Sequence, residues 1–269
     1  MQKNPDIDRT ALVAPRSLIE RVEERVCSAL RIASTRHISA TRDLRPPPEQ
    51  DLVDLIFRTV ACNYEQGDAA ANRNRSQQNW RWQLQTQISG NNRSREVVLE
   101  RKIAAACQHA CPKDWANQVP VASGLIAGPA GGRGAIDLAH RCGERRFELI
   151  ELKIASDTPL HAAVEIIEYG CIWLLARANP PSLKPEILDA DHVDLRVLAP
   201  VDYYRGYNLT ELEAALNRGC RALGQAQGVT MTFAFHALDE RLVGSVTLGD
   251  EALLAALDNR ISWMVGRSQ

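Results

Sequence analysis

Asp137, Glu151 and Lys153 form a pattern of charged residues that can carry metal-dependent chemistry. Asp137 interrupts the apolar segment G-A-I-D-L-A-H, and the other two interrupt F-E-L-I-E-L-K-I. Both segments have the composition of strands, and C-G-E-R between them is typical of a hairpin turn. Because side chains alternate along a strand, we expect Glu151 and Lys153 on one face. Asp137 comes alongside Glu151 if the two strands pair.

The chemistry of this pattern follows from its charges. Two carboxylates in a half-buried sheet repel each other, and one must take up a proton unless a cation lies between them. Their hard oxygen atoms suit Mg²⁺ or Mn²⁺, which also bind phosphate oxygens. Lys153 would direct an ammonium to the same place, where it can hold an attacking water or stabilise a phosphate transition state. The pattern therefore predicts a divalent-metal site that can act on a phosphate group.

The elements that position these residues follow from periodicity and capping. Apolar residues recur at helical spacing in two N-terminal segments, and Ser94 and Thr158 stand where they can cap later helices. Asn208, with Glu211 three residues on, predicts another helix start. The expected helices are 15–36, 48–66, 94–111, 159–178 and 208–226, and the expected strands are 118–126, 135–141, 146–154, 192–199 and 229–238. This mixture predicts an α/β sheet with helices on its faces.

The spacing of Asp137 from Glu151-Leu152-Lys153, with this order of elements, resembles the PD-(D/E)XK nuclease superfamily. The resemblance covers roughly residues 94–238 and implies a restriction-endonuclease-like mixed sheet flanked by helices. It implies that Asp137, Glu151 and the Leu152 carbonyl bind the metal and that Lys153 is catalytic. Ile136 stands where the family name has proline.

Further residues match the family less closely. Its first core helix often carries a glutamate, for which Glu100 and Glu96 are candidates; we assign Glu100 to the catalytic set. The helix after the motif often carries a polar residue and a tyrosine, matched loosely by Glu165 and Tyr169. The expected organisation is an N-terminal helical region with a basic loop (1–90) followed by the nuclease domain (91–269).

Charge is distributed unevenly along the chain. The net charge of −1 argues against a protein that binds nucleic acid by bulk charge. Residues 72–102, however, hold seven basic and two acidic side chains, whereas residues 180–259 hold six basic and twelve acidic ones. We therefore expect DNA to bind the first region, through Arg93, Arg95, Arg101 and Lys102.

Composition bounds the class of protein. Apolar residues make up 45% of the chain and charged residues 24%, as in an ordinary globular protein. No run of 18 apolar residues occurs and the first nine residues are polar, so we expect no membrane partner and a cytoplasmic protein. Seven cysteines without a C-x-x-C pair predict reduced, mostly buried thiols.

Other motifs carry weaker predictions. Cys107-x-His109-x-Cys111 lacks two further metal ligands, so packing is the expected role. The glycine turn at 128–134 lacks the Lys-Ser/Thr of a Walker A loop, and nothing orients Cys142 and His140 as a dyad. Trp80 and Trp82 either stack on bases or anchor the N-terminal helices.

Three functions compete. The first is a Mg²⁺- or Mn²⁺-dependent nuclease that hydrolyses DNA phosphodiester bonds, and double-strand cutting would favour a homodimer. The alternative is a catalytically silent nucleic-acid-binding or protein-interaction module of the same fold. The third is a structural protein whose helical N-terminal half docks a partner.

Overall fold

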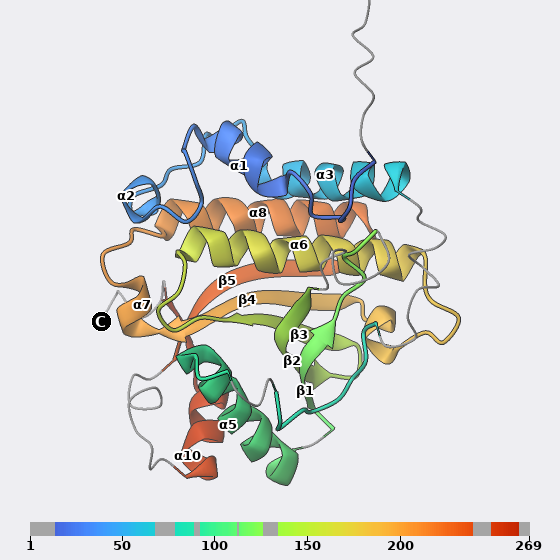
Figure 1. Ribbon diagram of the computed structural model, residues 1–269, viewed down its shortest axis with the longest axis vertical. Coiled ribbons are helices and arrows are strands. Elements are labelled where there is room, and N and C mark those ends of the chain that lie inside the picture. Colours follow the sequence, from blue (N-terminus) through green and yellow to red (C-terminus); the bar gives the residue numbers. More distant parts are fainter. Residues whose placement is uncertain are drawn as a thin grey trace, which may run out of the picture.

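A six-stranded mixed sheet with helices on both faces forms the centre of the molecule (Figure 1). The computed structural model describes residues 14–67, 79–88, 92–111, 113–125, 134–238 and 249–263. Its strands are β1 (Trp115–Pro120), β2 (Ala135–Gly143), β3 (Arg146–Leu152), β4 (His192–Pro200), β5 (Thr230–Leu238) and β6 (Ile261–Ser262), and they lie in this order in the sheet.

The connections make one half of the sheet antiparallel and the other parallel. β1, β2 and β3 form an antiparallel meander, β4 and β5 continue parallel to β3, and β6 is antiparallel to β5. The helices are α1 (Val22–Leu30), α2 (Ile38–Thr41), α3 (Leu52–Gln66), α5 (Arg95–Ala110), α6 (Pro159–Ala178), α7 (Val201–Tyr204), α8 (Thr210–Ala226) and α10 (Asp250–Asp258), with a short 3₁₀ helix at Glu186–Asp189. The α/β class with a helix-flanked mixed sheet is confirmed.

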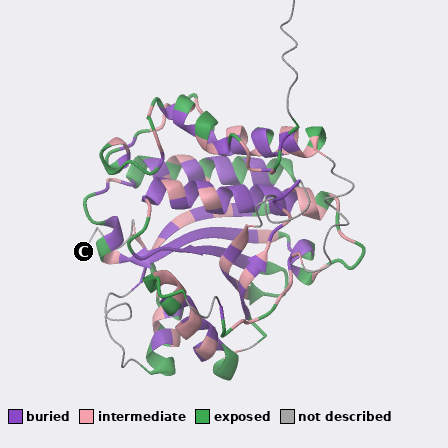
Figure 2. Ribbon diagram, viewed as in Figure 1, coloured by how far each residue is buried: buried purple, intermediate pink, exposed green. Residues whose placement is uncertain are grey.

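Two hydrophobic clusters lie on opposite faces of the sheet. The larger includes side chains of α1, α3, α6 and α8, and the smaller includes side chains of α5 and α10. Successive residues of β3 alternate between them: Leu149 joins the larger cluster, whereas Ile150 and Leu152 join the smaller. Figure 2 accordingly shows the strands and the inner helices mostly buried, with exposed residues on the outer faces. This alternation sets which side of β3 each charged residue occupies.

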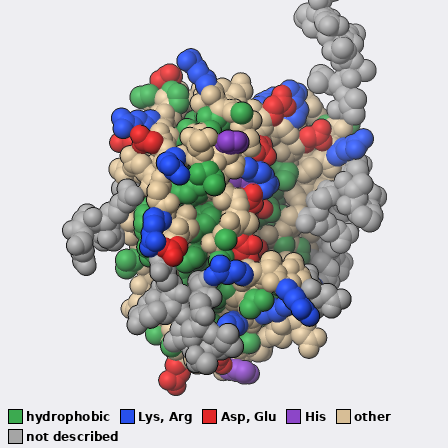
Figure 3. All heavy atoms as spheres, turned by 60° about the vertical axis from the view of Figure 1, so that its left-hand side comes forward, with side chains coloured by type: hydrophobic (Ala, Val, Ile, Leu, Met, Phe, Trp, Pro, Cys, Tyr) green, Lys and Arg blue, Asp and Glu red, His purple; other side chains and the backbone are tan. Residues whose placement is uncertain are grey.

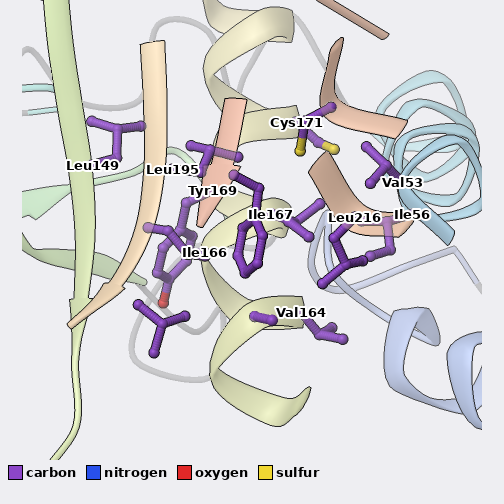
Figure 4. Packing of buried hydrophobic residues seen from close by; sticks show 14 of the residues in the cluster. Val53, Ile56, Leu149, Val164, Ile166, Ile167, Tyr169, Cys171, Leu195 and Leu216 are labelled. Carbon is purple, nitrogen blue, oxygen red and sulfur yellow. The ribbon is translucent and has the colours of Figure 1, made fainter. Parts of the chain in front are cut away.

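Helix α6 packs between the sheet and the N-terminal helices. Thr158 caps it by accepting a hydrogen bond from the His161 N–H at 3.2 Å, and Pro159 follows, as the sequence predicts. Figure 4 shows its side chains between Leu149 and Leu195 of the strands and Val53, Ile56 and Leu216 of α3 and α8. Among the described helices, α6 alone is long and apolar enough to cross a membrane, and 83% of that stretch is buried inside the protein. Its apolarity is therefore explained by its place in the core.

The predicted elements agree with the structure in order but not in every boundary. The first strand, expected at 118–126, is β1, which begins earlier, at Trp115, and ends at Pro120. The helix expected at 15–36 is limited to α1 because Arg21 and Arg31 adopt left-handed conformations at its ends. Asn208 does not cap α8: its amide donates to Asp43 Oδ1 at 2.9 Å instead, so that prediction was wrong. Neither α10 nor β6 was predicted.

The N-terminal region shares its core with the sheet. α3 contacts both α6 and α8, and the larger cluster joins Leu18 and Val22 to residues of the strands. Trp80 is buried in this cluster and Trp82 packs against Phe147 of β3. Both tryptophans therefore anchor the packing, and the segment 79–88 is neither a helix nor a strand. The domain boundary at residue 90 stays a prediction.

The cysteines are free, as the sequence predicts. Four of the seven are buried, and only Cys142 is exposed. Cys107 belongs to the smaller hydrophobic cluster, while His109 is an exposed residue on the same helix. The C-x-H-x-C motif thus contributes packing, and the glycine turn lies outside the described residues apart from Gly134.

Candidate active site

The candidate site lies where β2 begins and β3 ends. The pairing of these strands runs from Gly143 and Arg146 to Leu138 and Ile150 and stops there. One residue further, the Asp137 carboxylate accepts a hydrogen bond from the Leu152 N–H at 2.9 Å. This side chain therefore occupies the position where the ladder would have continued, directly beside the end of β3.

Lys153 contacts carboxylates from two elements. Its Nζ lies 2.7 Å from Glu151 Oε1 and 3.1 Å from Glu165 Oε2 of α6, and the residue is only 8% exposed. Burial disfavours the charged ammonium, but the charges of Glu151 and Glu165 outweigh it and raise the pKa of Lys153. Glu151 and Lys153 thus share one face, as predicted, and the lysine is held charged between β3 and α6.

The carboxylates around Lys153 carry more negative charge than one ammonium balances. Burial is the main cause that raises the pKa of Asp137 to about 6, and the Leu152 N–H and Lys153 oppose it. Burial and the charge of Asp137 raise the pKa of Glu151 well above its ordinary value. Raised pKa values of this kind are expected where carboxylates lie close together without enough positive charge to balance them. A cation between them would remove the repulsion.

The structure distinguishes the two glutamates of α5 that the sequence offers as candidates for the catalytic set. Glu100 is buried, and it accepts hydrogen bonds from the amides of Asn117 and Gln118 of β1 at 3.0 Å. Burial, together with the charge of Asp137, raises its pKa to about 7. Glu96 instead accepts from the Ile154 N–H at 3.1 Å and from Ser156 Oγ at 2.6 Å. Glu100 therefore faces the site, whereas Glu96 holds the chain that follows β3.

Tyr169 and Glu165 lie one helical turn apart on α6. The Tyr169 hydroxyl donates to Glu165 Oε1 at 3.4 Å, while the other oxygen of Glu165 contacts Lys153. Gly134, just before β2, permits this arrangement: a Cβ there would lie 2.8 Å from the Tyr169 ring. The loose sequence match of these two residues thus corresponds to side chains that reach the site.

The donor set of this site fits a divalent cation. Asp137 and Glu151 supply carboxylate oxygens from neighbouring strands, and Leu152 carries its backbone carbonyl between Glu151 and Lys153. All of these donors are hard oxygen atoms, which bind hard cations. Glu165 is already engaged by Lys153 and Tyr169.

A second group of side chains, His140, Cys142 and Glu148, can also hold a metal ion. One ligand atom from each lies within 4.8 Å of the others, with His140 Nδ1 at 3.3 Å from Glu148 Oε2 and 3.5 Å from Cys142 Sγ. This mixed donor set of sulfur, nitrogen and oxygen is softer than the first and resembles zinc ligands. The pair Cys142 and His140 was considered from the sequence, but Glu148 was missed because a hairpin turn separates it from them.

Arginines compete for this second group. The Glu148 carboxylate pairs with Arg260 and lies 3.8 Å from Arg196, and these charges together with His140 hold its pKa well below the ordinary value despite burial. Although Cys142 is exposed as a whole residue, desolvation of its sulfur and the charge of Glu148 raise the pKa of its thiol to about 12. A metal here would have to displace Arg260 from Glu148 and a proton from Cys142.

The predicted DNA-binding residues lie on and beside α5. Arg93 and Arg95 are exposed at the start of this helix, and Lys102 is half-buried. Arg101 donates a hydrogen bond from its guanidinium to the backbone carbonyl of Ile88. This side chain therefore also links α5 to the segment 79–88. On the face shown in Figure 3, basic and acidic side chains are interspersed without one large patch of either sign.

Comparisons with protein families, characterised proteins and solved structures give no match for this chain.

Proposed function

We propose that this protein is a divalent-metal-dependent nuclease of the PD-(D/E)XK type that hydrolyses DNA phosphodiester bonds. The observation that carries the proposal is the position of Lys153. Its ammonium lies within hydrogen-bonding distance of Glu151 and Glu165. It lies at the end of β3, where the Asp137 carboxylate accepts a hydrogen bond from the Leu152 N–H. Such a juxtaposition of one ammonium with a buried and two half-buried carboxylates is costly for a purely structural site.

The arrangement of elements supports the same proposal. α5, the meander β1–β2–β3, α6 and β4 follow one another as in the restriction-endonuclease-like core, with α5 and α6 on opposite faces of the sheet (Figure 1). The candidate residues come from α5, β2, β3 and α6, and they converge at one end of this core.

Each residue then has a defined role. Asp137, Glu151 and the Leu152 carbonyl would hold Mg²⁺ or Mn²⁺, which when bound polarises a phosphate oxygen and makes water more acidic. Lys153 would stabilise the charge that develops on the phosphate and help to hold the attacking water. Glu100, with a pKa of about 7, can take up or release a proton near neutral pH at its carboxyl oxygen.

Cleavage of DNA tests this proposal directly. Plasmid, linear duplex and single-stranded DNA are incubated with the protein in Mg²⁺, in Mn²⁺ or in EDTA. We expect cleavage in either metal and none in EDTA, and Asp137→Asn should be inactive because a charged metal ligand is lost. A folded protein that cleaves no DNA in any metal would instead support the silent binding module.

The basic residues at the start of α5 give a separate prediction. The double variant Arg93→Gln/Arg95→Gln should weaken DNA binding and reduce the slope of log K against log salt by about 1.5, since each lost phosphate contact removes about 0.7–0.9. Binding is measured by fluorescence anisotropy at several salt concentrations. Arg218→Gln/Arg221→Gln, which removes two exposed charges from α8, is the matched control. An unchanged slope in the first variant would place the DNA elsewhere.

A further inference from the structure

A cavity of about 510 Å³ lies between the N-terminal helical region and α6, beside the candidate site. Its volume is that of a small-molecule pocket. Glu165 lines the cavity and also contacts Lys153 at 3.1 Å, so the cavity and the candidate site share one side chain. Asp137, Glu151 and Lys153 do not line it, and the proposed nuclease chemistry therefore leaves the cavity unexplained.

The charged side chains that line this cavity are mostly acidic. They are the carboxyl groups of Glu23, Glu24, Glu165 and Glu168 and the guanidinium groups of Arg21 and Arg36. Both arginines are already paired, Arg21 with Glu24 at 3.1 Å and Arg36 with Asp157. Glu165 is paired with Lys153. For Glu23 and Glu168 the described residues supply no lysine or arginine partner, so the cavity favours a cationic ligand and opposes an anionic one.

Glu168 is the most deeply buried carboxyl group of the lining. It is 7% exposed, and no hydrogen bond from the described residues contributes to its pKa. Fully enclosed polar atoms without a partner occur elsewhere in the described chain, for example at His236, but not at Glu168. Its carboxyl oxygens therefore open into the cavity that it lines. An unpartnered polar group at this depth destabilises the fold, which indicates that it serves a ligand.

Glu23 is a second, half-buried carboxylate that faces the same cavity. It accepts a hydrogen bond from the Thr35 hydroxyl and lies 4.0 Å from His161 Nδ1. Burial, together with the charge of Arg36, lowers the pKa of His161, so this imidazole is neutral near neutral pH and does not balance Glu23. The charge of Glu23 also acts on Glu168, which places the two carboxyl groups within reach of one ligand.

The carboxyl groups of the cavity do not converge closely enough to hold a small metal ion. Among the described residues, only His140, Cys142 and Glu148 bring three ligand atoms within 4.8 Å of one another, and none of these lines the cavity. Ile19 and the buried Val164 add apolar wall to the acidic lining. A chain of methylene groups that joins separate cationic groups matches both features.

We infer that this cavity binds an aliphatic polyamine, a flexible chain that carries several ammonium groups. One ammonium pairs with Glu168 and another with Glu23, and the methylene groups between them lie against Ile19 and Val164. The inference does not depend on the proposed nuclease function, because neither DNA nor the metal takes part in this binding.

Binding should release a proton from Glu168. Burial, with the charges of Glu165 and Glu23, raises the pKa of this carboxyl well above its ordinary value, and an ammonium beside it lowers that pKa again. His161 is already neutral, so the released proton comes from Glu168 and the affinity should rise with pH. The other charged or titratable groups around the ligand are Arg21, Glu23, Glu24, Arg36, Glu165 and Tyr169, with Lys153 behind Glu165.

Spermidine and octanediol test the cavity, because they are chains of similar length and only spermidine is charged. Binding to the full chain is measured by isothermal titration calorimetry at physiological ionic strength, in EDTA and without DNA. We expect one spermidine to bind per chain, and the diol to bind about tenfold more weakly or worse. Titrations in buffers of different ionisation enthalpy measure the released proton.

Variants of the lining separate a ligand contact from a structural role. Glu168→Gln keeps the shape of the side chain but cannot become charged, so it should weaken spermidine binding about tenfold or more and remove most of the proton release. Glu23→Gln should weaken binding less, and it provides a second test if Glu168→Gln does not fold. Glu65→Gln, at an exposed glutamate of α3, is the control and should change neither quantity.

Arg36→Gln distinguishes a cationic ligand from an anionic one. It removes a positive charge from the lining and should leave spermidine binding unchanged or tighter. Weaker binding in this variant, equal binding of octanediol, or an unchanged affinity in Glu168→Gln would overturn the proposal. These measurements contain no DNA, so a failure of the cavity proposal and a failure of the nuclease proposal are distinguishable.

Discussion

Lys153→Met is expected to lower metal-dependent DNA cleavage about 100-fold or more, the scale of one electrostatic group at a reaction centre. The substitution keeps most of the apolar stem and deletes the ammonium that lies 2.7 Å from Glu151 and 3.1 Å from Glu165. DNA affinity should change little, because the expected phosphate contacts of Arg93 and Arg95 are retained. Single-turnover cleavage and anisotropy, measured on the same preparation, separate the two effects.

The contacts of Lys153 also predict a cost in stability. Without its ammonium, Glu151 and Glu165 lose a shared buried partner, and breaking a buried ion pair costs about 3–5 kcal/mol. Mg²⁺ should restore part of this loss, so cleavage is measured in saturating metal after the fold is checked by circular dichroism. Lys184→Met, at a more exposed lysine outside the site, is the control. Wild-type cleavage by a folded Lys153→Met protein would refute the nuclease proposal.

The free energy of unfolding of the metal-free protein is expected to fall by several kcal/mol as the pH rises from about 4.5 to about 7. Asp137 and Glu100 have folded pKa values of about 6 and about 7, and that of Glu151 is also raised. Their unfolded values are 3.8 for Asp137 and 4.5 for the glutamates. Within this window the folded state holds protons that the unfolded state has released. Raising the pH therefore favours unfolding.

Carboxyl groups with lowered pKa values change the free energy of unfolding only at more acidic pH. Glu148 and Asp194 pair with arginines, and their contribution to stability is lost only as the pH falls below their unfolded values of 4.5 and 3.8. Stability in EDTA should therefore be greatest near pH 5. Urea denaturation at intervals between about pH 3.5 and about pH 8 measures this profile.

Mg²⁺ should change the same profile. A cation bound to Asp137 and Glu151 stabilises their charged forms, so the metal should raise stability most near pH 8 and flatten the curve. Glu151→Gln removes one carboxyl whose pKa is raised, and this variant should lose most of the stabilisation by Mg²⁺. Glu65→Gln, on the exposed side of α3, should keep that stabilisation. A flat profile in EDTA, or the same Mg²⁺ response in Glu151→Gln, would contradict the shared cation site.

Local pattern was enough to predict the elements that carry the candidate site. The alternation of charge and apolar residues placed Glu151 and Lys153 on one face of a strand, and the structure has them 2.7 Å apart. Ser94 and Thr158 cap α5 and α6, as their residue types predict. Periods and caps depend on residues within a few positions of one another, so the sequence shows them directly.

Only the tertiary structure decided which residues meet from distant parts of the chain. Glu96 and Glu100 lie one turn apart on α5, and the sequence could not show that the first would bind the chain after β3 and the second β1. Likewise, Glu168 resembles any helical glutamate until the N-terminal region closes over α6 and buries it. These differences arise from contacts between segments far apart in sequence, because burial and electrostatics depend on the packed neighbours of a side chain and not on its own local pattern.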